Sequence, residues 1–205
     1  MPTSHTLTTI YNRALDHISE FPISSPQEPT AYARWLNRNY SSIVEAALRL
    51  DVWNFACRFA QVQEDAEPPV MRWRRRFKLP PFCVRVLQPT QDGYRNGYPL
   101  PYAVQGDYLL MNGTPTKGIE YIANLQNPGE WDSLFSELVA AQLAAGMAQR
   151  FTGKTSYLDR CVQLASEARD RASEINAFEG TAQEPDQDDI IRLRGADGDY
   201  DHRRW

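Results

Sequence analysis

Few side chains in this sequence have the types and spacing that catalysis or metal binding requires. None of the histidines pairs with another at metal-ligand spacing, and the cysteines, odd in number, form no CxxC motif. These residues are His5, His17, His202, Cys57, Cys83 and Cys161. We therefore expect no catalytic residue, no metal site and no cofactor, and we interpret the cysteines as reduced, buried thiols of an intracellular protein.

One stretch resembles a nucleotide-binding loop. The sequence AQRFTGKT, residues 148–155, is one glycine short of a P-loop. A P-loop follows a strand and opens a helix, whereas this GKT comes at the end of a predicted helix. The spacing therefore favours a helix stop at Gly153 over phosphate binding.

Three acids lie close together in the sequence, and paired carboxyl groups can hydrolyse glycosides. They are Glu130, Asp132 and Glu137. Acids in the first turns of a helix also suit the positive end of the helix dipole, and we favour that reading. A cell-wall hydrolase is retained only as a minor alternative.

The strongest local charge is basic and lies in RWRRRFK, residues 72–78. Polar and apolar residues alternate there, which predicts a strand with one basic face. The basic residues are Arg72, Arg74, Arg75, Arg76 and Lys78. Such a face is either solvated or contacts DNA phosphates or an acidic protein, so a DNA-binding module is an alternative function. The formal net charge of −4 gives no overall basic balance that would argue for tight nucleic-acid binding.

Composition and length bound the architecture. The 205 residues suffice for one domain with an appendage, and 42% hydrophobic with 23% charged residues is ordinary for a globular protein. No run of eighteen apolar residues predicts a membrane span, and the first residues do not have the pattern of a secretory signal. We expect no membrane partner.

Four segments have helical periodicity, at residues 4–18, 30–50, 130–152 and 156–178. The third organises the chain: Trp131, Leu134, Phe135 and Leu138 predict an amphipathic helix, and the small residues between Ala140 and Ala148 imply a closely packed neighbour. Between the second and third helices, residues 52–125 alternate in short runs separated by turn dipeptides such as Asp92-Gly93 and Asn112-Gly113.

These patterns predict a mainly α fold of the α+β class. We expect a four-helix-bundle-like core with a small antiparallel β meander inserted at about residues 52–125. We expect one domain over residues 1–180. Residues 181–205 hold seven acids and four arginines without periodicity, and we expect a flexible, disordered or extended arm there.

Several ordered motifs resemble one protein family. W-x-x-x-F-x-LP-x-x-C-x-R-V-L runs from Trp73 to Leu87, and Y-x-V-x-G-x-x-LL follows from Tyr102 to Leu110. I-x-Y begins at Ile119, and a Trp-x-x-Leu-Phe segment begins at Trp131 ahead of an alanine-rich stretch and FTGK. Each motif is degenerate, and their order carries the resemblance. The chain resembles the head-to-tail adaptors of tailed phages, of the tail tubular protein A or tail accessory factor type, and the adaptors of gene-transfer agents.

The resemblance implies a structural virion protein and not an enzyme. Copies of such adaptors form a ring, usually dodecameric, under the portal protein; the ring extends the channel for genomic DNA and docks a nozzle or other tail component. It further implies a virion location at the head–tail interface, after assembly in the host cytoplasm, and a C-terminal arm that reaches the portal. The expected arm contacts are Ile190, Ile191, Arg192, Leu193, Arg194, Arg203, Arg204 and Trp205. The expected tail-docking loop contains Tyr94, Arg95, Asn96 and Tyr98.

Overall fold

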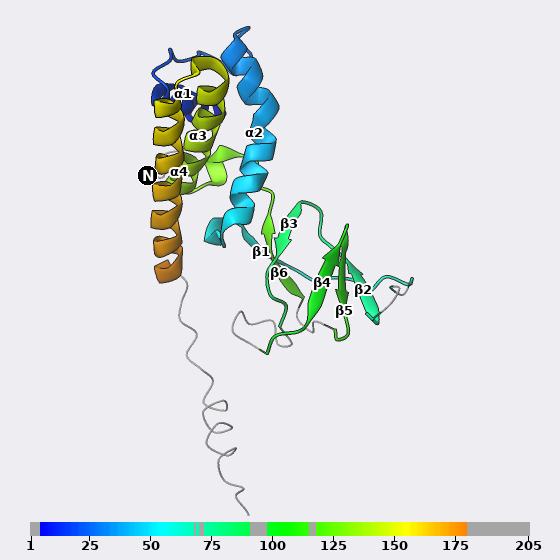
Figure 1. Cartoon of the computed structure of the whole chain (residues 1–205). Coiled ribbons are helices and arrows are strands. Elements are labelled where there is room, and N and C mark those ends of the chain that lie inside the picture. Colours follow the sequence, from blue (N-terminus) through cyan, green and yellow to red (C-terminus); the bar gives the residue numbers. More distant parts are fainter. Residues whose placement is uncertain (1–4, 68, 70–71, 91–97, 115–117, 180–205) are drawn as a thin grey trace, which may run out of the picture.

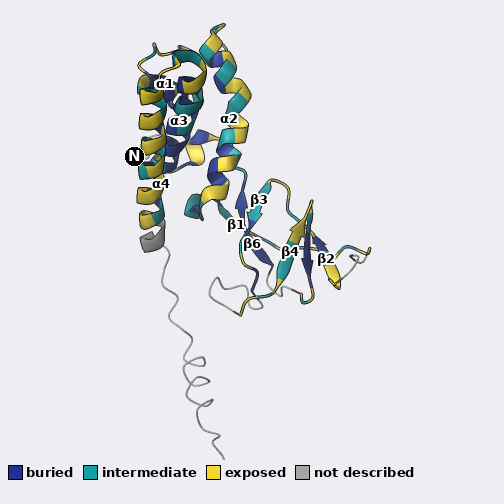
Figure 2. Cartoon of the chain, in the orientation of Figure 1, coloured by how far each residue is buried: buried dark blue, intermediate teal, exposed yellow. Residues whose placement is uncertain are grey.

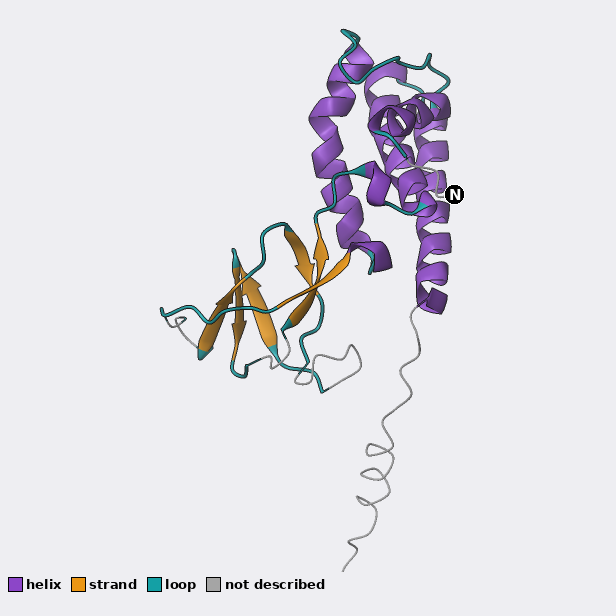
Figure 3. Ribbon diagram, turned by 180° about the vertical axis from the view of Figure 1, so that it is seen from behind, coloured by secondary structure: helices purple, strands orange, loops and turns teal. Residues whose placement is uncertain are grey.

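The chain folds into a helical body and a β lobe that extends from one end of it (Figures 1 and 3). The computed structural model describes residues 5–67, 69, 72–90, 98–114 and 118–179. Its helices fall within or close to the ranges that periodicity predicts. They are α1 (Leu7–His17), α2 (Ala31–Leu50), α3 (Ser133–Met147) and α4 (Thr155–Glu179).

Helix α3 is the centre of the helical body, because α1, α2 and α4 all pack against it. Its residues are buried on nearly every side, including Leu138, Val139 and Ala141 (Figure 2). The expectation of a single apolar face was therefore wrong for α3: a helix that is apolar all round belongs inside a core. Gly146 allows α2 to approach closely, since a Cβ atom there would lie 2.5 Å from Cη2 of Trp35.

The β lobe contains two three-stranded antiparallel sheets. One sheet has the order β1-β6-β3 and the other the order β2-β5-β4. Their strands are β1 (Cys57–Ala60), β2 (Arg75–Lys78), β3 (Cys83–Val86), β4 (Tyr102–Gln105), β5 (Tyr108–Met111) and β6 (Ile119–Ala123). Of the described strands, β4 and β5 form the expected tight hairpin, with Gly106 in the left-handed conformation at its turn.

The β1-β6-β3 sheet joins two hydrophobic cores. Ile122 and Val84 belong to the core of the helical body, whereas Ile119 and Val86 belong to a second core with Phe77 and other residues of the β2-β5-β4 sheet. Ile119 and Ile122 are three residues apart on β6 and so point to opposite faces, and the register of β3 shifts between Cys83 and Arg85. The sheet can therefore contact the helices on one face and the second sheet on the other.

The predicted four-helix bundle with a simple meander is therefore wrong. The fold is a mixed helix and strand architecture with four helices and two three-stranded sheets. The reason is that β6 is apolar on both faces, which gives the strands a core of their own. A meander would pair strands in sequence order, whereas β6 lies between β1 and β3 and β5 lies between β2 and β4.

Within the described residues, no helix is long and apolar enough to cross a membrane. The predicted arm at residues 181–205 lies outside the described part of the chain.

Candidate functional site

The acids that suggested hydrolysis have separate structural positions. Asp132 caps α3: its Oδ1 atom accepts hydrogen bonds from the backbone N–H groups of Leu134 (2.6 Å) and Phe135 (3.0 Å). Glu130 is exposed in η2 (Pro128–Glu130), the short 3-10 turn before α3. These positions support helix capping and surface roles over a catalytic pair.

Glu137 lies against two side chains of α1, Arg13 and His17. Its carboxylate lies 3.0 Å from the Arg13 guanidinium and 2.9 Å from Nε2 of His17. The His17 Nε2 atom is buried, and its only polar neighbour among the described residues is this carboxylate, which it approaches without hydrogen-bond geometry. The contact with His17, aided by the charge of Arg13, holds the pKa of Glu137 below its ordinary value despite partial burial. The cluster joins α1 to α3, which gives Glu137 a structural position.

The stretch that resembles a P-loop ends a helix, as its position predicts. α3 continues into η3 (Ala148–Thr152), a π-helical turn, and Gly153 follows with a φ of 62°. The left-handed glycine stops the helix before α4 begins at Thr155. The chain around Lys154 therefore lacks the strand-to-helix geometry that cradles phosphates.

The cysteines and histidines do not gather into a site in the part of the chain that the structure describes. Cys161 is buried, and Cys57 and Cys83 are partly buried. Burial raises the pKa of the Cys83 and Cys161 thiols. Among the described residues no three His, Cys, Asp or Glu side chains are grouped to hold a metal ion.

The basic stretch at residues 72–78 is largely matched by acids of the same lobe. Only Arg75–Lys78 form a strand, β2. Arg75 pairs with Glu64 at 3.2 Å, and Arg76 pairs with Asp65 at 3.0 Å. Arg76 also contacts Glu67 and lies over the Tyr108 ring, with 4.5 Å between its Cζ atom and the ring centroid.

The other basic residues of this stretch, Arg72, Arg74 and Lys78, form no ion pair with a described acid. The Arg72 guanidinium lies 5.2 Å from the centre of the Trp73 ring. Arg74 and Lys78 are exposed, and no described acid pairs with either. Of the five basic side chains, two are paired with acids of the same lobe and three remain, which is a weak base for DNA binding because affinity grows with the number of phosphates neutralised.

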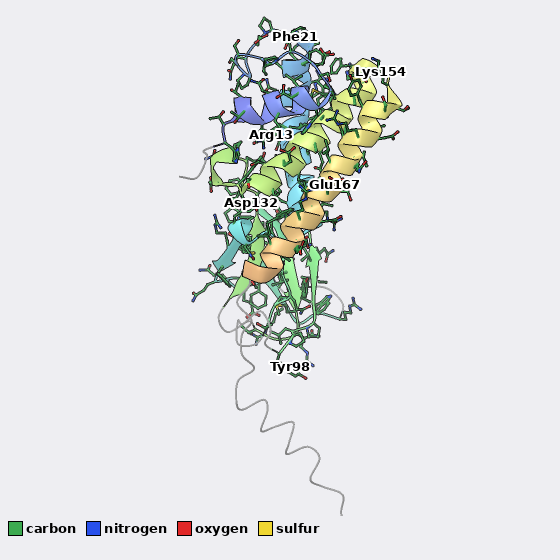
Figure 4. The ribbon with its side chains drawn as sticks, turned by 90° about the vertical axis from the view of Figure 1, so that its left-hand side faces the viewer. Arg13, Phe21, Tyr98, Asp132, Lys154 and Glu167 are labelled. Carbon is green, nitrogen blue, oxygen red and sulfur yellow. The ribbon has the colours of Figure 1, made fainter. Side chains whose placement is uncertain are left out.

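The β lobe displays large aromatic side chains to solvent. Tyr98 and Phe82 are each 76% exposed and Phe59 is 74% exposed. Tyr98, the one described member of the predicted tail-docking loop, lies at the outer end of the lobe (Figure 4). Tyr94, Arg95 and Asn96 lie outside the described residues. So do all the predicted arm contacts, Ile190 to Arg194 and Arg203 to Trp205.

Phe82 is held in an unusual backbone conformation. Its φ is 62°, in the left-handed region that disfavours bulky side chains. It is the third residue of a turn closed by a hydrogen bond from the Cys83 N–H to the Pro80 carbonyl at 3.3 Å, and its own carbonyl accepts from the Asn124 N–H at 2.7 Å. Position three of such a turn normally holds glycine. The fold thus holds an exposed aromatic ring in a strained turn, which is a feature often associated with binding sites.

The sequence did not point to Phe82, because no residue type in the PPFC stretch indicates a left-handed backbone conformation. Sequence reasoning also missed a pocket at the opposite end of the molecule, lined by Ala31, Arg34, Trp35, Arg38, Arg150 and Phe151. The spacing of Arg34 and Arg38 places both on one helix face, and that signal was readable. Their meeting with Arg150 depends on the tertiary fold.

No protein family matches this chain, and no curated protein resembles it closely enough to count as a match.

Proposed function

We propose that this protein is a structural head-to-tail adaptor of a tailed phage or a related particle. Its copies form a closed ring beneath the portal, and the ring extends the DNA channel and carries the next tail component. The protein acts through contact surfaces, with no substrate and no bond-making step.

The observation that carries this proposal is that residues of the ordered sequence motifs pack together in the two hydrophobic cores. Trp131 and Phe135 of the last motif contact each other, with ring centres 5.0 Å apart, and Phe135 lies 4.8 Å from the buried Trp53. Phe77 of the first motif and Leu109 of the second share the β-lobe core. Segments far apart in the sequence thus build the two cores, which is what a set of ordered fold-determining motifs should do.

The shape of the molecule supports a bridging role. Phe21 and Lys154 mark one end and Tyr98 marks the other (Figure 4). Exposed aromatic residues lie at both ends, since Phe21 is 90% exposed and Tyr98 is 76% exposed. Exposed aromatic side chains are enriched in protein interfaces, where they bury large areas at low entropic cost. A subunit with such groups at both ends suits an adaptor between two assemblies.

Helix α4 carries a further candidate contact. Ala172 is buried against the body, but Ile175, one turn later on the same face, is 46% exposed. The apolar face of α4 therefore continues past the part of the body that covers it. In the proposed ring, a neighbouring copy covers this surface in a head-to-tail contact that closes by rotation.

The test is binding to the portal protein of the same particle. We expect the full chain to co-migrate with the portal in size-exclusion chromatography. A variant with Ile190, Ile191 and Leu193 changed to serine should lose binding, while the Val162→Ser control on the outer face of α4 should keep it.

Failure of the wild-type chain to bind the portal at micromolar concentrations would refute the proposed function. Unchanged binding by the triple variant would refute the arm assignment alone.

A further inference from the structure

We propose that the pocket between α2 and the end of α3 binds the carboxylate side chains of an acidic segment of a partner protein. This site lies at the end of the molecule marked by Phe21 and Lys154, away from the β lobe (Figure 4). The inference does not depend on the proposed function, because it concerns the chemistry of the pocket alone.

Three arginines surround the pocket, and two helices supply them. Arg34 and Arg38 are one turn apart on α2, and Arg150 comes from the π-helical turn after α3. The cavity between them has a volume of about 180 Å³. Single-turn π-helical bulges are frequently found at functional sites, and here the bulge carries Arg150 and Phe151 into the pocket wall.

Among the residues that the structure describes, no acid balances the positive charge of the pocket. No described carboxylate forms an ion pair with Arg34, Arg38 or Arg150, in contrast to Arg13, Arg75 and Arg76 elsewhere in the fold. The Arg34 side chain donates only a long hydrogen bond, 3.5 Å, to the Pro29 carbonyl. Guanidinium groups bind carboxylates through paired, charge-assisted hydrogen bonds. The pocket therefore presents donors to an acid from outside the described fold.

Two aromatic rings form apolar walls, and each is held in place. The far edge of Trp35 lies over Gly146, where any larger side chain would meet it. The Phe151 ring lies 4.7 Å from the Tyr32 ring. Walls of this kind suit the aliphatic part of a Glu side chain, with its carboxylate at the arginines. Their fixed position lowers the entropy lost on binding.

The occupant that fits best is an acidic protein segment and not DNA. Duplex DNA binds through many phosphates along an open surface, and its affinity comes from their number. A small concave site with apolar walls uses only one or two anionic groups and gains from contact with carbon atoms. Those properties favour carboxylate side chains.

The pocket lies near the start of α4, whereas the acids from Glu184 to Asp189 follow its C-terminal end and are too far away to fill the pocket of their own chain. Residue Asp189 is ten positions beyond Glu179, a reach of at most about 35 Å. Helix α4 alone spans about 37 Å over its 25 residues. Arg150 precedes α4, at the far end of that length. Asp197, Asp199 and Asp201 are 18 to 22 positions beyond Glu179 and have the reach that the earlier acids lack. We assign the pocket to a separate acidic protein, and the experiment below tests that assignment against these three acids.

Isothermal titration calorimetry on the full chain tests the site. The probe is a synthetic peptide in which glutamates alternate with glycines, and its neutral counterpart has glutamine for glutamate. Arg34→Glu with Arg38→Glu should weaken binding of the acidic peptide at least about tenfold, because two charge-assisted contacts are reversed. The matched control is Arg74→Glu with Lys78→Glu, which makes the same change in charge on the β lobe and should stay within about twofold of the wild type.

A second variant, Arg38→Gln with Arg150→Gln, removes charge without reversing it and should also weaken the acidic peptide. Circular dichroism of each variant checks that the fold is kept.

Several outcomes would overturn the proposal: equal binding of the neutral peptide, equal losses in the pocket and control variants, or tighter and pocket-dependent binding of duplex DNA or orthophosphate. Tighter peptide binding after Asp197, Asp199 and Asp201 are changed to asparagine would assign the pocket to the chain's own C-terminal acids.

Discussion

At the scale of single residues, the contact between Glu137 and its two basic partners makes stability depend on pH. The folded-state pKa of Glu137 lies below its ordinary value of 4.5. Its contribution is therefore fully present above pH 4.5 and is lost as the pH falls through the lower folded-state pKa.

We predict that Glu137→Gln lowers the free energy of unfolding by about 1 kcal/mol at pH 7, because the side chain is partly exposed. The difference from wild type should shrink below pH 4.5. Urea denaturation at pH 7 and at pH 3.5 measures both values. An equal difference at the two pH values would mean that the lowered pKa of Glu137 contributes nothing to folding.

Phe82 gives the second prediction at this scale. Glycine adopts a φ of 62° without the strain that a side chain causes, and the exposed ring contributes little to either core. Phe82→Gly should therefore raise the free energy of unfolding by about 0.5–1 kcal/mol. Phe82→Ala keeps the strained backbone and serves as the control, with a change within about 0.5 kcal/mol. A stability loss in the glycine variant would show that the ring itself holds the turn.

At the scale of elements, sequence periodicity was enough to place the helices along the chain but not to predict which of them is the most buried. The alanine-rich half of α3 pointed to close neighbours, and Gly146 against Trp35 is such a contact. That α3 would be covered on all sides depends on where α1 and α4 return in space, and local spacing does not encode it. The β4–β5 hairpin was readable because Gly106-Asp107 is local, whereas the pairing of β6 with β1 and β3 joins distant segments.

The start of β6 provides a prediction for this scale. Gly118 has a φ of 97°, and a Cβ atom there would lie 2.4 Å from the Ala60 carbonyl oxygen at the end of β1. Gly118→Ala should therefore lower the free energy of unfolding by about 2–4 kcal/mol. The loss has two sources: backbone strain at Gly118, and a clash that only a shift of the β1 backbone could relieve.

Gly106→Ala is the matched control. Gly106 also has a positive φ, but no atom lies within 4 Å of the added Cβ, so only the strain of about 1 kcal/mol applies. Thermal or urea unfolding compares the two variants. Equal losses would indicate that β1 moves away from Gly118 at no cost and that the β1–β6 edge is loosely held.

At the scale of the whole molecule, the sequence predicted a helical body with an inserted β region, and its error was to expect a four-helix-bundle-like core with one small meander. Ile119 and Ile122 on β6 point into different cores, so the β lobe is a second packing unit fused to the first through one sheet. The basic stretch looked free in the sequence because Glu64 and Asp65 are about ten positions away, and only the fold brings them to Arg75 and Arg76. The pocket at the other end could be read only in part, because Arg34 and Arg38 are neighbours on α2 but only the fold brings Arg150 to them.

The central proposal is that copies of this protein assemble beneath a portal. Native mass spectrometry of the protein mixed with that portal tests this assembly most directly. We predict a complex that carries a fixed, repeated number of copies of this 205-residue chain on each portal ring. A mixture in which the chain remains monomeric and separate from the portal, at concentrations where both are folded, would contradict the account.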